Sequence, residues 1–223
     1  MATIPKAGAR VTPRSAWLNN IIARLEKVHA DAKLDLDFTD PLQLLIALIL
    51  AAQARDDLVN KVTVELFKAK HSAADYANMP LTELEKHIGK INFYRNKAKS
   101  IHHCCQQLVE RFNGKVPDNL QDLISLPGVG RKTANIVLGN GFGQQAIGVD
   151  THVMRLSQRL GLTKKTDPDK IEADLTAIVP ERQRVRFCHL MQYHGRRVCL
   201  AKKPKCPGCA IKNLCAFPGK TKT

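Results

Sequence analysis

The sequence has few aromatic residues and no apolar run long enough to cross a membrane. Phe, Trp and Tyr make up 5% of the 223 residues, and the longest apolar stretch, Leu42 to Ala52, is interrupted by Gln43. A stretch of this length is too short for a bilayer span. Residues 1–16 are polar and basic and lack the apolar core of a secretory signal. These absences exclude a membrane or fibrous protein and predict a soluble cytoplasmic one.

Acidic residues are missing from both ends of the chain. Residues 1–25 contain four basic residues and residues 182–223 contain eleven, with no acidic residue in either, whereas residues 26–181 hold twenty of each sign. The whole formal charge of +15 therefore comes from the two ends. Such clusters favour a polyanionic partner, above all nucleic acid, although two solvated basic tails are the alternative. We expect residues 1–14 to form a disordered basic tail.

Strand patterns are nearly absent, and helical periodicity recurs along the chain. Asp40-Pro41 signals the start of a helix that is apolar on almost every face, so we expect that helix to be buried. The apolar face predicted for the first helix consists of Trp17, Ile21, Leu25 and Val28. We predict an all-α protein with helices at Ala16–Val28, Pro41–Ala52, Asp57–Lys68, Ala73–Asn78, Pro80–Ile88, Tyr94–Phe112, Leu120–Ser125, Arg131–Gly139, Thr151–Leu160, Pro168–Val179 and Arg182–Cys199.

The seven cysteines fall into two sets. Cys104, Cys105 and Cys188 lie within helical patterns and are expected to be buried apolar residues. The other four are packed into seventeen residues near the C-terminus, at Cys199, Cys206, Cys209 and Cys215. Four thiolates this close together can bind one metal centre, and their spacing leaves a tetrahedral zinc site and a [4Fe-4S] cluster equally open.

Three lysines, Lys202, Lys203 and Lys205, lie between the first two cysteines of this cluster. A loop that a metal holds at both ends would present these charges at fixed positions, which suits a phosphate backbone. The alternative is a solvated loop whose lysines have no partner.

Residues 126–134, Leu-Pro-Gly-Val-Gly-Arg-Lys-Thr-Ala, have the pattern of a helix-hairpin-helix. One helix ends at Leu-Pro-Gly, a tight turn follows, and a new helix begins at once. Gly128 and Gly130 let the backbone approach a phosphate, and Arg131 begins a helix whose positive end favours an anion. Such binding reads no bases, so it suits an enzyme that scans DNA. A purely structural turn is the alternative.

Lys132 and Asp150 are the candidate catalytic residues. Lys132 lies in the first turn of the predicted helix beside Arg131, and neighbouring positive charge favours a neutral, nucleophilic amine. Asp150 follows an apolar run and directly precedes another helix, so it is a candidate N-cap whose carboxylate the backbone holds in place. A surface lysine that contacts phosphate and a purely structural cap are the alternatives.

From about residue 16 to 217 the chain resembles the endonuclease III family of helix-hairpin-helix DNA glycosylases. The resemblance rests on residues 126–134, on Val149-Asp-Thr-His152, on His194-Gly-Arg196 and on the spacing of the four cysteines. It implies two helical domains that flank a DNA-binding cleft, with a [4Fe-4S] cluster on the four cysteines. The helical barrel that carries the hairpin would span residues 34–144, and the iron–sulfur domain would combine residues 15–33 with 145–223.

The same resemblance implies a bifunctional base-excision repair enzyme that acts as a monomer on double-stranded DNA containing damaged bases or abasic sites. Lys132 would displace an oxidised pyrimidine and form a Schiff base, which permits β-elimination at the abasic site (AP lyase activity), with Asp150 assisting. Gln53 would fill the gap left by the flipped base, and Asp56 would lie near the pocket.

Two residues depart from the family pattern. Phe93 stands where an aliphatic wedge is expected, and its ring could stack on the orphan base. Arg55 stands where a small polar residue is more usual and would add charge at the mouth of the cleft. Both departures affect the expected range of lesions rather than the chemistry.

Three other classes of function compete with this interpretation. An adenine-mismatch glycosylase would usually lack the lysine at position 132 and carry a further C-terminal domain, whereas this chain stops eight residues after Cys215. A non-catalytic DNA-binding module would have no use for Lys132 paired with Asp150. An iron–sulfur electron carrier would draw support from the cysteine motif alone.

Overall fold

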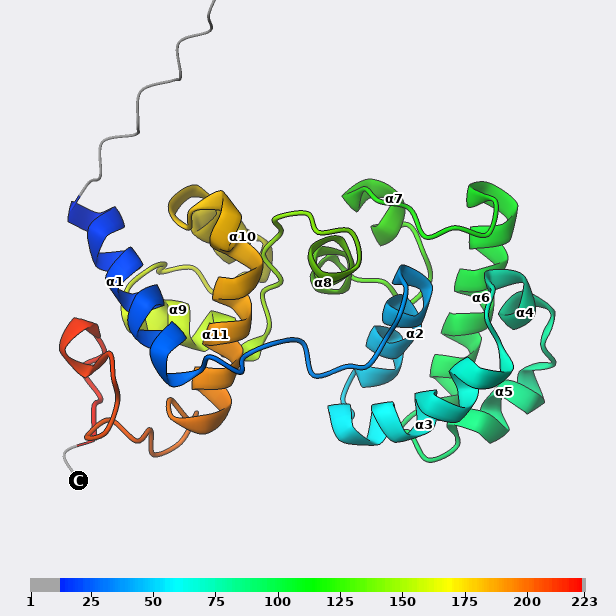
Figure 1. The fold of residues 1–223 in the computed structure, drawn as a ribbon, viewed down its shortest axis with the longest axis horizontal. Coiled ribbons are helices and arrows are strands. Elements are labelled where there is room, and N and C mark those ends of the chain that lie inside the picture. The colour runs from blue at the N-terminus through cyan, green and yellow to red at the C-terminus, as the bar shows by residue number, and fades with distance from the viewer. Residues whose placement is uncertain (1–12, 222–223) are drawn as a thin grey trace, which may run out of the picture. The chain divides into compact units, whose positions relative to one another are not determined.

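The computed structural model describes residues 13–221, which form helices and connecting loops without a β-strand (Figure 1). This confirms the predicted all-α class. The elements are α1 (Pro13–Val28), α2 (Pro41–Ala51), α3 (Asp56–Ala69), α4 (Ala73–Asn78), α5 (Leu81–Ile88), α6 (Tyr94–Phe112), α7 (Leu120–Ile124), α8 (Arg131–Gly141), α9 (Thr151–Leu160), α10 (Pro168–Ile178), the 3-10 turn η1 (Glu181–Gln183), α11 (Arg184–Arg197) and the 3-10 turn η2 (Lys212–Leu214).

Most predicted helix ends agree with the structure within two residues. The largest difference is at α1, which begins at Pro13 rather than Ala16. Proline is well suited to the first turn of a helix, because its missing N–H would have no intrahelical partner there. Residues 13 and 14 of the predicted disordered tail are therefore helical, and residues 1–12 lie outside the described part of the chain.

The chain divides into two compact units. Unit 1 combines residues 1–32 with 151–223, and unit 2 is the continuous segment 33–150. The sequence-based boundaries differ in assigning residues 145–150 to the domain that carries the cysteines. In the structure Ile147 and Val149 are buried, and Ile147 accepts a hydrogen bond from a residue of α8, so this segment packs with unit 2.

Unit 2 is built around α2, as its all-apolar sequence predicts. Asp40 is the N-cap, and its carboxylate accepts hydrogen bonds from the backbone N–H groups of Leu42 and Gln43 at 2.8 and 2.9 Å. The helix packs against α3, α6 and α8. Its buried side chains are Leu44, Leu45, Ile46, Ala47, Ile49 and Leu50.

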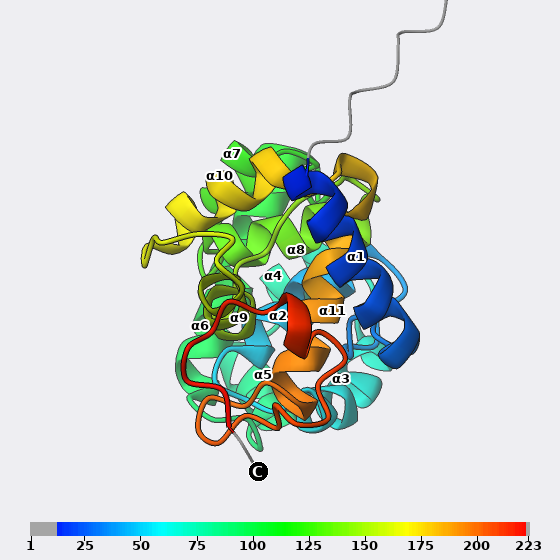
Figure 2. The same ribbon diagram turned by 90° about the vertical axis from the view of Figure 1, so that its left-hand side faces the viewer.

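In unit 1, α11 packs against both α1 and α9 (Figure 2). The prediction for the first helix holds for Ile21 and Leu25, which are fully buried, but is wrong for Val28, which is 50% exposed at the end of α1. Leu18 and Ile22 complete the buried face instead. Cys188 of α11 is buried, as are Cys104 and Cys105 of α6, which confirms their predicted role as core residues.

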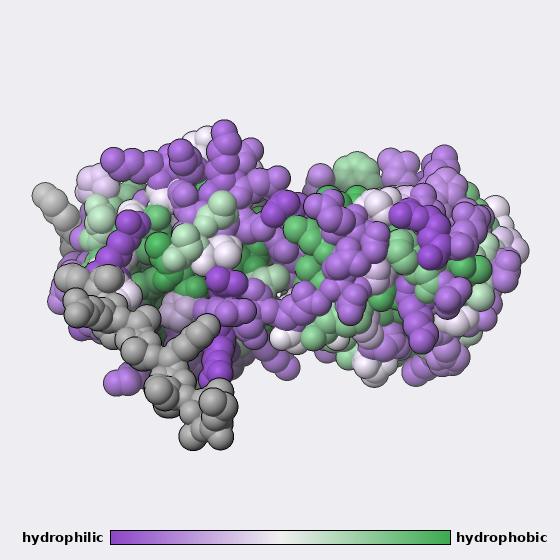
Figure 3. Space-filling view, turned by 90° about the horizontal axis from the view of Figure 1, so that it is seen from above, coloured by the Kyte–Doolittle hydropathy of each residue, from purple (hydrophilic) through white to green (hydrophobic). Residues whose placement is uncertain are grey.

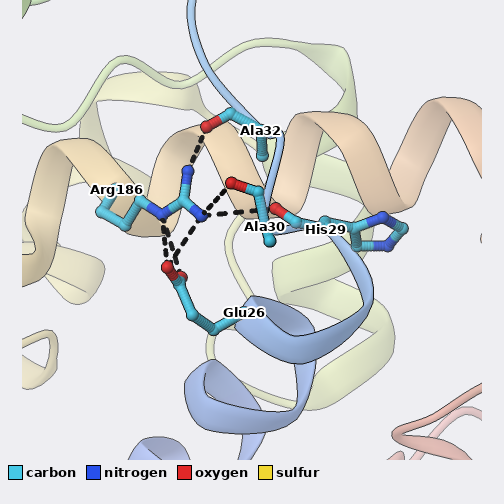
Figure 4. Close-up of polar contacts among 5 residues, drawn as sticks. All are labelled: Glu26, His29, Ala30, Ala32 and Arg186. Carbon is cyan, nitrogen blue, oxygen red and sulfur yellow. Dashed lines mark hydrogen bonds and ion pairs between the residues drawn. The ribbon is translucent and has the colours of Figure 1, made fainter.

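Arg186 ties the two separate segments of unit 1 together (Figure 4). Its guanidinium, on α11, forms an ion pair with Glu26 of α1 at 2.8 Å. It also donates to the carbonyls of His29 and Ala30 at 3.3 and 3.2 Å and to the carbonyl of Ala32. These carbonyls follow the C-terminal end of α1, where backbone acceptors lack intrahelical donors. One side chain thus satisfies the end of α1 and fixes it to α11.

Figure 3 shows hydrophilic side chains over most of the visible face of each unit, with smaller apolar patches between them. Within residues 13–221, the structure contains no helix of the length and apolarity that a membrane span requires.

Candidate functional site

The hairpin between α7 and α8 has the geometry that its sequence predicts. Leu126 and Val129 are buried and anchor the turn, and the Val129 N–H donates to the Leu126 carbonyl at 3.2 Å. Gly128 has φ of +79°, and a Cβ there would lie 2.9 Å from the Cβ of Ser100 on α6. Both conformation and packing therefore exclude a side chain at Gly128. Gly130 differs, because a Cβ on it would meet no atom within 4 Å.

The N-terminus of α8 is suited to bind an anion. Gly130 is the N-cap, no side chain caps the helix, and its first turn contains no acidic residue. The leading N–H groups and the positive end of the helix dipole therefore favour a negatively charged ligand. Arg131, which is half-buried, and Lys132, which is exposed, begin the helix at this point.

The structure brings the segments of Lys132 and Asp150 together within unit 2. The buried Asn135 donates through Nδ2 to the carbonyl of Ile147 at 3.0 Å, which fixes the segment before Asp150 to α8. A Cβ on Gly148 would lie 3.6 Å from the carbonyl oxygen of Lys132 itself. Asp150 follows two residues later, is half-buried, and directly precedes α9. The amine and the carboxylate therefore come from backbone segments in direct contact.

Gln53 and Phe93 both have left-handed backbone conformations, with φ of 55° and 58°. Among the described residues only two other non-glycine residues, Asn113 and Lys203, have positive φ. Asn113 ends α6, where this conformation is ordinary for asparagine. The other three are residues that the sequence analysis assigns to DNA contact, and strained backbone gathers at functional sites.

Phe93 is an exposed apolar residue beside a buried one, whereas charged residues follow Gln53 in the chain. Phe93 is 63% exposed, which is unusual for a large apolar side chain, while Ile91 beside it is buried. Asp56 begins α3, and Arg55 before it forms a bidentate ion pair with Asp57, with two contacts of 2.9 Å. The charge that Arg55 was expected to add is thus neutralised by its own neighbour.

The four cysteines of the C-terminal cluster line one cavity of unit 1, of about 30 Å³. Burial raises the pKa of the Cys209 thiol, and the three neighbouring cysteines add to the rise. A centre of positive charge between four sulfurs relieves this repulsion. Among residues 13–221 no three acidic, histidine or cysteine side chains converge as ligands of a single ion. The donor set and the shared cavity fit a thiolate-bound cluster.

Two side chains lie within hydrogen-bonding distance of these sulfurs. Arg159 of α9 lies 3.2 Å from the Cys199 sulfur, and His194 Nε2 lies 3.4 Å from the Cys209 sulfur. Burial lowers the pKa of His194 to about 4, and proximity to His29 adds to this, so its ring is neutral. A neutral ring that donates through Nε2 accepts through Nδ1, which lies 3.0 Å from His29 Nε2. Donors of this kind stabilise thiolate ligands.

The loop between the first two cysteines exposes Lys202, Lys203 and Lys205, as expected. Arg159 holds it by donating to the carbonyls of Leu200 and Ala201 at 2.8 and 2.9 Å. The sequence did not indicate that Arg159, Arg155 and Lys97 form long-range hydrogen bonds that hold the segments of the predicted sites in place. Their partners lie about 40 residues or more away in the chain, and no local pattern links them.

More than half of the chain matches a known protein family. Residues 46–181 match the family described as the HhH-GPD superfamily base excision DNA repair protein. That range includes the hairpin of α7 and α8 and the segment that leads to Asp150. The chain is therefore a helix-hairpin-helix protein of base excision DNA repair.

Similar proteins of known sequence or structure identify the family within this class. The chain is 48% identical over 196 residues to endonuclease III of Synechocystis sp., covering 87% of this chain and 90% of that protein. It is 38% identical over 200 residues to endonuclease III of Escherichia coli K12, covering 90% and 95%. A solved structure of a trapped endonuclease III–DNA covalent intermediate has a TM-score of 0.85 and 42% identity, covering 90% of this chain and 95% of that one. The chain belongs to the endonuclease III family. This confirms the predicted family and its base-excision repair activity, DNA glycosylase with AP lyase.

Proposed function

We propose that this protein removes oxidised pyrimidines from double-stranded DNA and then cleaves the abasic strand, with Lys132 and Asp150 as its catalytic residues. The observation that carries the proposal is the packing of Gly148 on the backbone of Lys132, which holds the Asp150 segment beside the first turn of α8. An amine and a carboxylate from adjoining segments can act as a nucleophile and a stabiliser of positive charge at one reacting carbon.

Lys132 is the nucleophile in this proposal. The damaged nucleotide is first flipped out of the base stack, at an unstacking cost that a lesion lowers. The neutral amine attacks C1′, and the base leaves with the electrons of the glycosidic bond. Ring opening and loss of a proton from the nitrogen give a Schiff base, from which β-elimination expels the 3′ phosphate. Asp150 stabilises positive character on the sugar and assists the proton transfers.

DNA is the partner, held chiefly through its backbone. Gly128, Gly130 and Arg131 contact phosphates at the hairpin, supported by the uncapped N-terminus of α8. Gln53 and Phe93 enter the space that the flipped nucleotide leaves, supported by their strained backbone and exposure. The similar solved structure is itself a DNA complex. The exposed lysines 202, 203 and 205 add contacts to phosphate.

Cys199, Cys206, Cys209 and Cys215 would hold a [4Fe-4S] cluster. When bound, the cluster supplies four cross-links that brace the loop, while the lysines of the loop contact the DNA. We also propose that the protein acts as a monomer in the cytoplasm, at the nucleoid, where its substrate lies.

Borohydride trapping tests the assignment of Lys132. Incubation with a duplex that contains one thymine glycol, followed by reduction, should give a covalent protein–DNA band with the wild type and none with Lys132→Ala. Lys86→Ala, which removes an exposed lysine from α5 of the same unit, should behave as the wild type.

Other outcomes of this assay contradict particular parts of the proposal. Free base without a trapped band would mean a monofunctional glycosylase and a different role for Lys132. A duplex with a preformed abasic site distinguishes a failure in lesion range from a failure in chemistry. No trapping on either duplex would favour a non-catalytic DNA-binding protein.

A further inference from the structure

The C-terminal end of α2 is held by a buried lysine from another helix. The last turn of α2 contains no basic residue that could donate to its final carbonyls. Lys97 of α6 supplies a donor, because its ammonium donates to the carbonyls of Leu50 and Ala52 at 2.7 and 2.6 Å. Lys97 is only 7% exposed, which is rare for a lysine. Its side chain is therefore committed to this contact.

This contact fixes the peptide bond immediately before Gln53. The Ala52 carbonyl belongs to the peptide that joins Ala52 to Gln53, so the Lys97 ammonium limits rotation at the point where the backbone turns into its left-handed conformation. The turn closes with a hydrogen bond from the Ala54 N–H to the Ala51 carbonyl at 3.1 Å. Gln53 itself is exposed. A strained conformation of this kind persists only where its surroundings hold it.

The backbone of Lys97 also restrains the conformation of Phe93. The Lys97 N–H donates to the Phe93 carbonyl at 3.1 Å and forms the first turn of α6. Phe93 is the N-cap of that helix, with left-handed backbone, and no side chain caps it. One residue thus anchors both strained positions, through its side chain on one and its N–H on the other. Ser100, on the next turn of α6, occupies the space that a Cβ on Gly128 of the hairpin would need.

We propose that Lys97 is a positioning residue for base excision, which couples the Gln53 turn to the Phe93 loop so that both side chains enter the DNA as one rigid pair. This inference rests on the proposed function, in which those two residues fill the space of the flipped nucleotide. Lys97 touches neither DNA nor the reacting atoms. It acts through the two residues that do, and it keeps them in place before DNA binds.

A double-mutant cycle distinguishes positioning from general stability. Lys97→Met keeps the length of the side chain but removes its donors. Placement errors of about 1 Å cost roughly a hundredfold in rate, so Lys97→Met should lower kcat/KM for thymine glycol excision by about tenfold to a hundredfold. In a Gln53→Ala background the same change should cost much less, because the residue through which Lys97 acts is already absent. Lys115→Met, which removes an exposed charge beyond the far end of α6, is the matched control.

A base-stacking probe gives a second readout that a loss of stability would not produce. With 2-aminopurine opposite the lesion, the wild type should change its fluorescence on binding, and Lys97→Met should lose most of this change at saturating protein. If Lys97→Met does not fold, Lys97→Gln, whose amide can still donate to one carbonyl, replaces it in the same cycle.

The outcomes separate the two proposals. Strictly additive effects of the Lys97 and Gln53 changes, or an unchanged fluorescence response, would overturn the inference while leaving the glycosylase intact. A wild type that excises no base would overturn the proposed function and the inference with it.

Discussion

Alanine substitutions at the two hairpin glycines, Gly128 and Gly130, should have different effects. Gly128→Ala meets both a positive φ and the Cβ of Ser100, so it should destabilise the fold by about 1–3 kcal/mol. Gly130→Ala meets no atom within 4 Å and has φ of −86°, so the unfolding midpoint should not change. The added methyl group would instead obstruct a phosphate at the helix N-terminus and weaken DNA binding roughly tenfold, about 1.4 kcal/mol.

Urea unfolding and fluorescence anisotropy on an undamaged duplex measure these two quantities separately. A stable Gly130→Ala variant that binds DNA as tightly as the wild type would show that the backbone there does not approach phosphate. An equal loss of stability in both variants would contradict the packing argument for Gly128.

At the scale of single residues, the sequence predicted what local chemistry determines. Asp40 caps α2 because an aspartate carboxylate accepts hydrogen bonds from the free N–H groups at a helix N-terminus. Gly128 adopts the turn that the residues on either side of it predict. Lys97 could not be predicted, because the carbonyls it contacts lie 47 and 45 residues away. Only the fold brings such partners together.

Among the elements, α1 is held to α11 by several polar contacts at its C-terminal end. Its end is held to α11 by Arg186, which bonds to Glu26 and to three carbonyls that no helical donor reaches. Arg186→Ala should remove this donor from the Ala30 and Ala32 carbonyls, whereas the His29 carbonyl keeps the Ala32 N–H. The change should destabilise unit 1 by about 1–3 kcal/mol, of which the half-exposed ion pair contributes the smaller part. Arg182→Ala, an exposed arginine in η1, should change stability by less than about 0.5 kcal/mol.

Chemical unfolding followed by circular dichroism checks both variants. Equal midpoints for Arg186→Ala and the wild type would mean that water replaces the guanidinium at the end of α1 without cost.

Helices were predictable to the extent that one face is buried. In α9 the apolar positions Val153, Leu156 and Leu160 recur at helical spacing, and all three are buried. In α1 the same reasoning chose Val28, which is exposed at the last position of the helix, whereas Leu25 in the same turn is fully buried. A periodic pattern identifies a helix, but its partner decides which residues of the last turn are covered.

For the whole molecule, charge is distributed very unequally between the two units. Unit 1 contains 21 basic and 7 acidic residues, a formal charge of +14, whereas unit 2 contains 14 basic and 13 acidic residues. The catalytic candidates belong to the nearly neutral unit. In the proposed function, unit 1 would therefore supply most of the long-range attraction for DNA, whereas the catalytic candidates lie in unit 2, so we expect the two to be alterable separately.

Salt dependence of DNA binding tests this separation. Replacing Lys202, Lys203 and Lys205 together by alanine should reduce the slope of log K against log salt by about 0.9 for each lysine that contacts a phosphate. The catalytic rate at saturating DNA should stay near that of the wild type. A control triple variant at Lys164, Lys165 and Lys170 removes the same charge from another exposed stretch of unit 1. Equal changes of slope in both variants would mean that only net charge matters.

The division of the chain also has a consequence for its synthesis on the ribosome. Unit 2 is continuous, so all of it can fold once residue 150 has emerged, whereas α1 emerges first and must wait for α11. At typical rates of translation that wait lasts roughly ten seconds or more. During this time Leu18, Ile21 and Leu25 lack the surface that buries them in the finished protein. The four cysteines emerge after the whole of unit 2, so the cluster proposed for them could form only once Cys215 has left the ribosome.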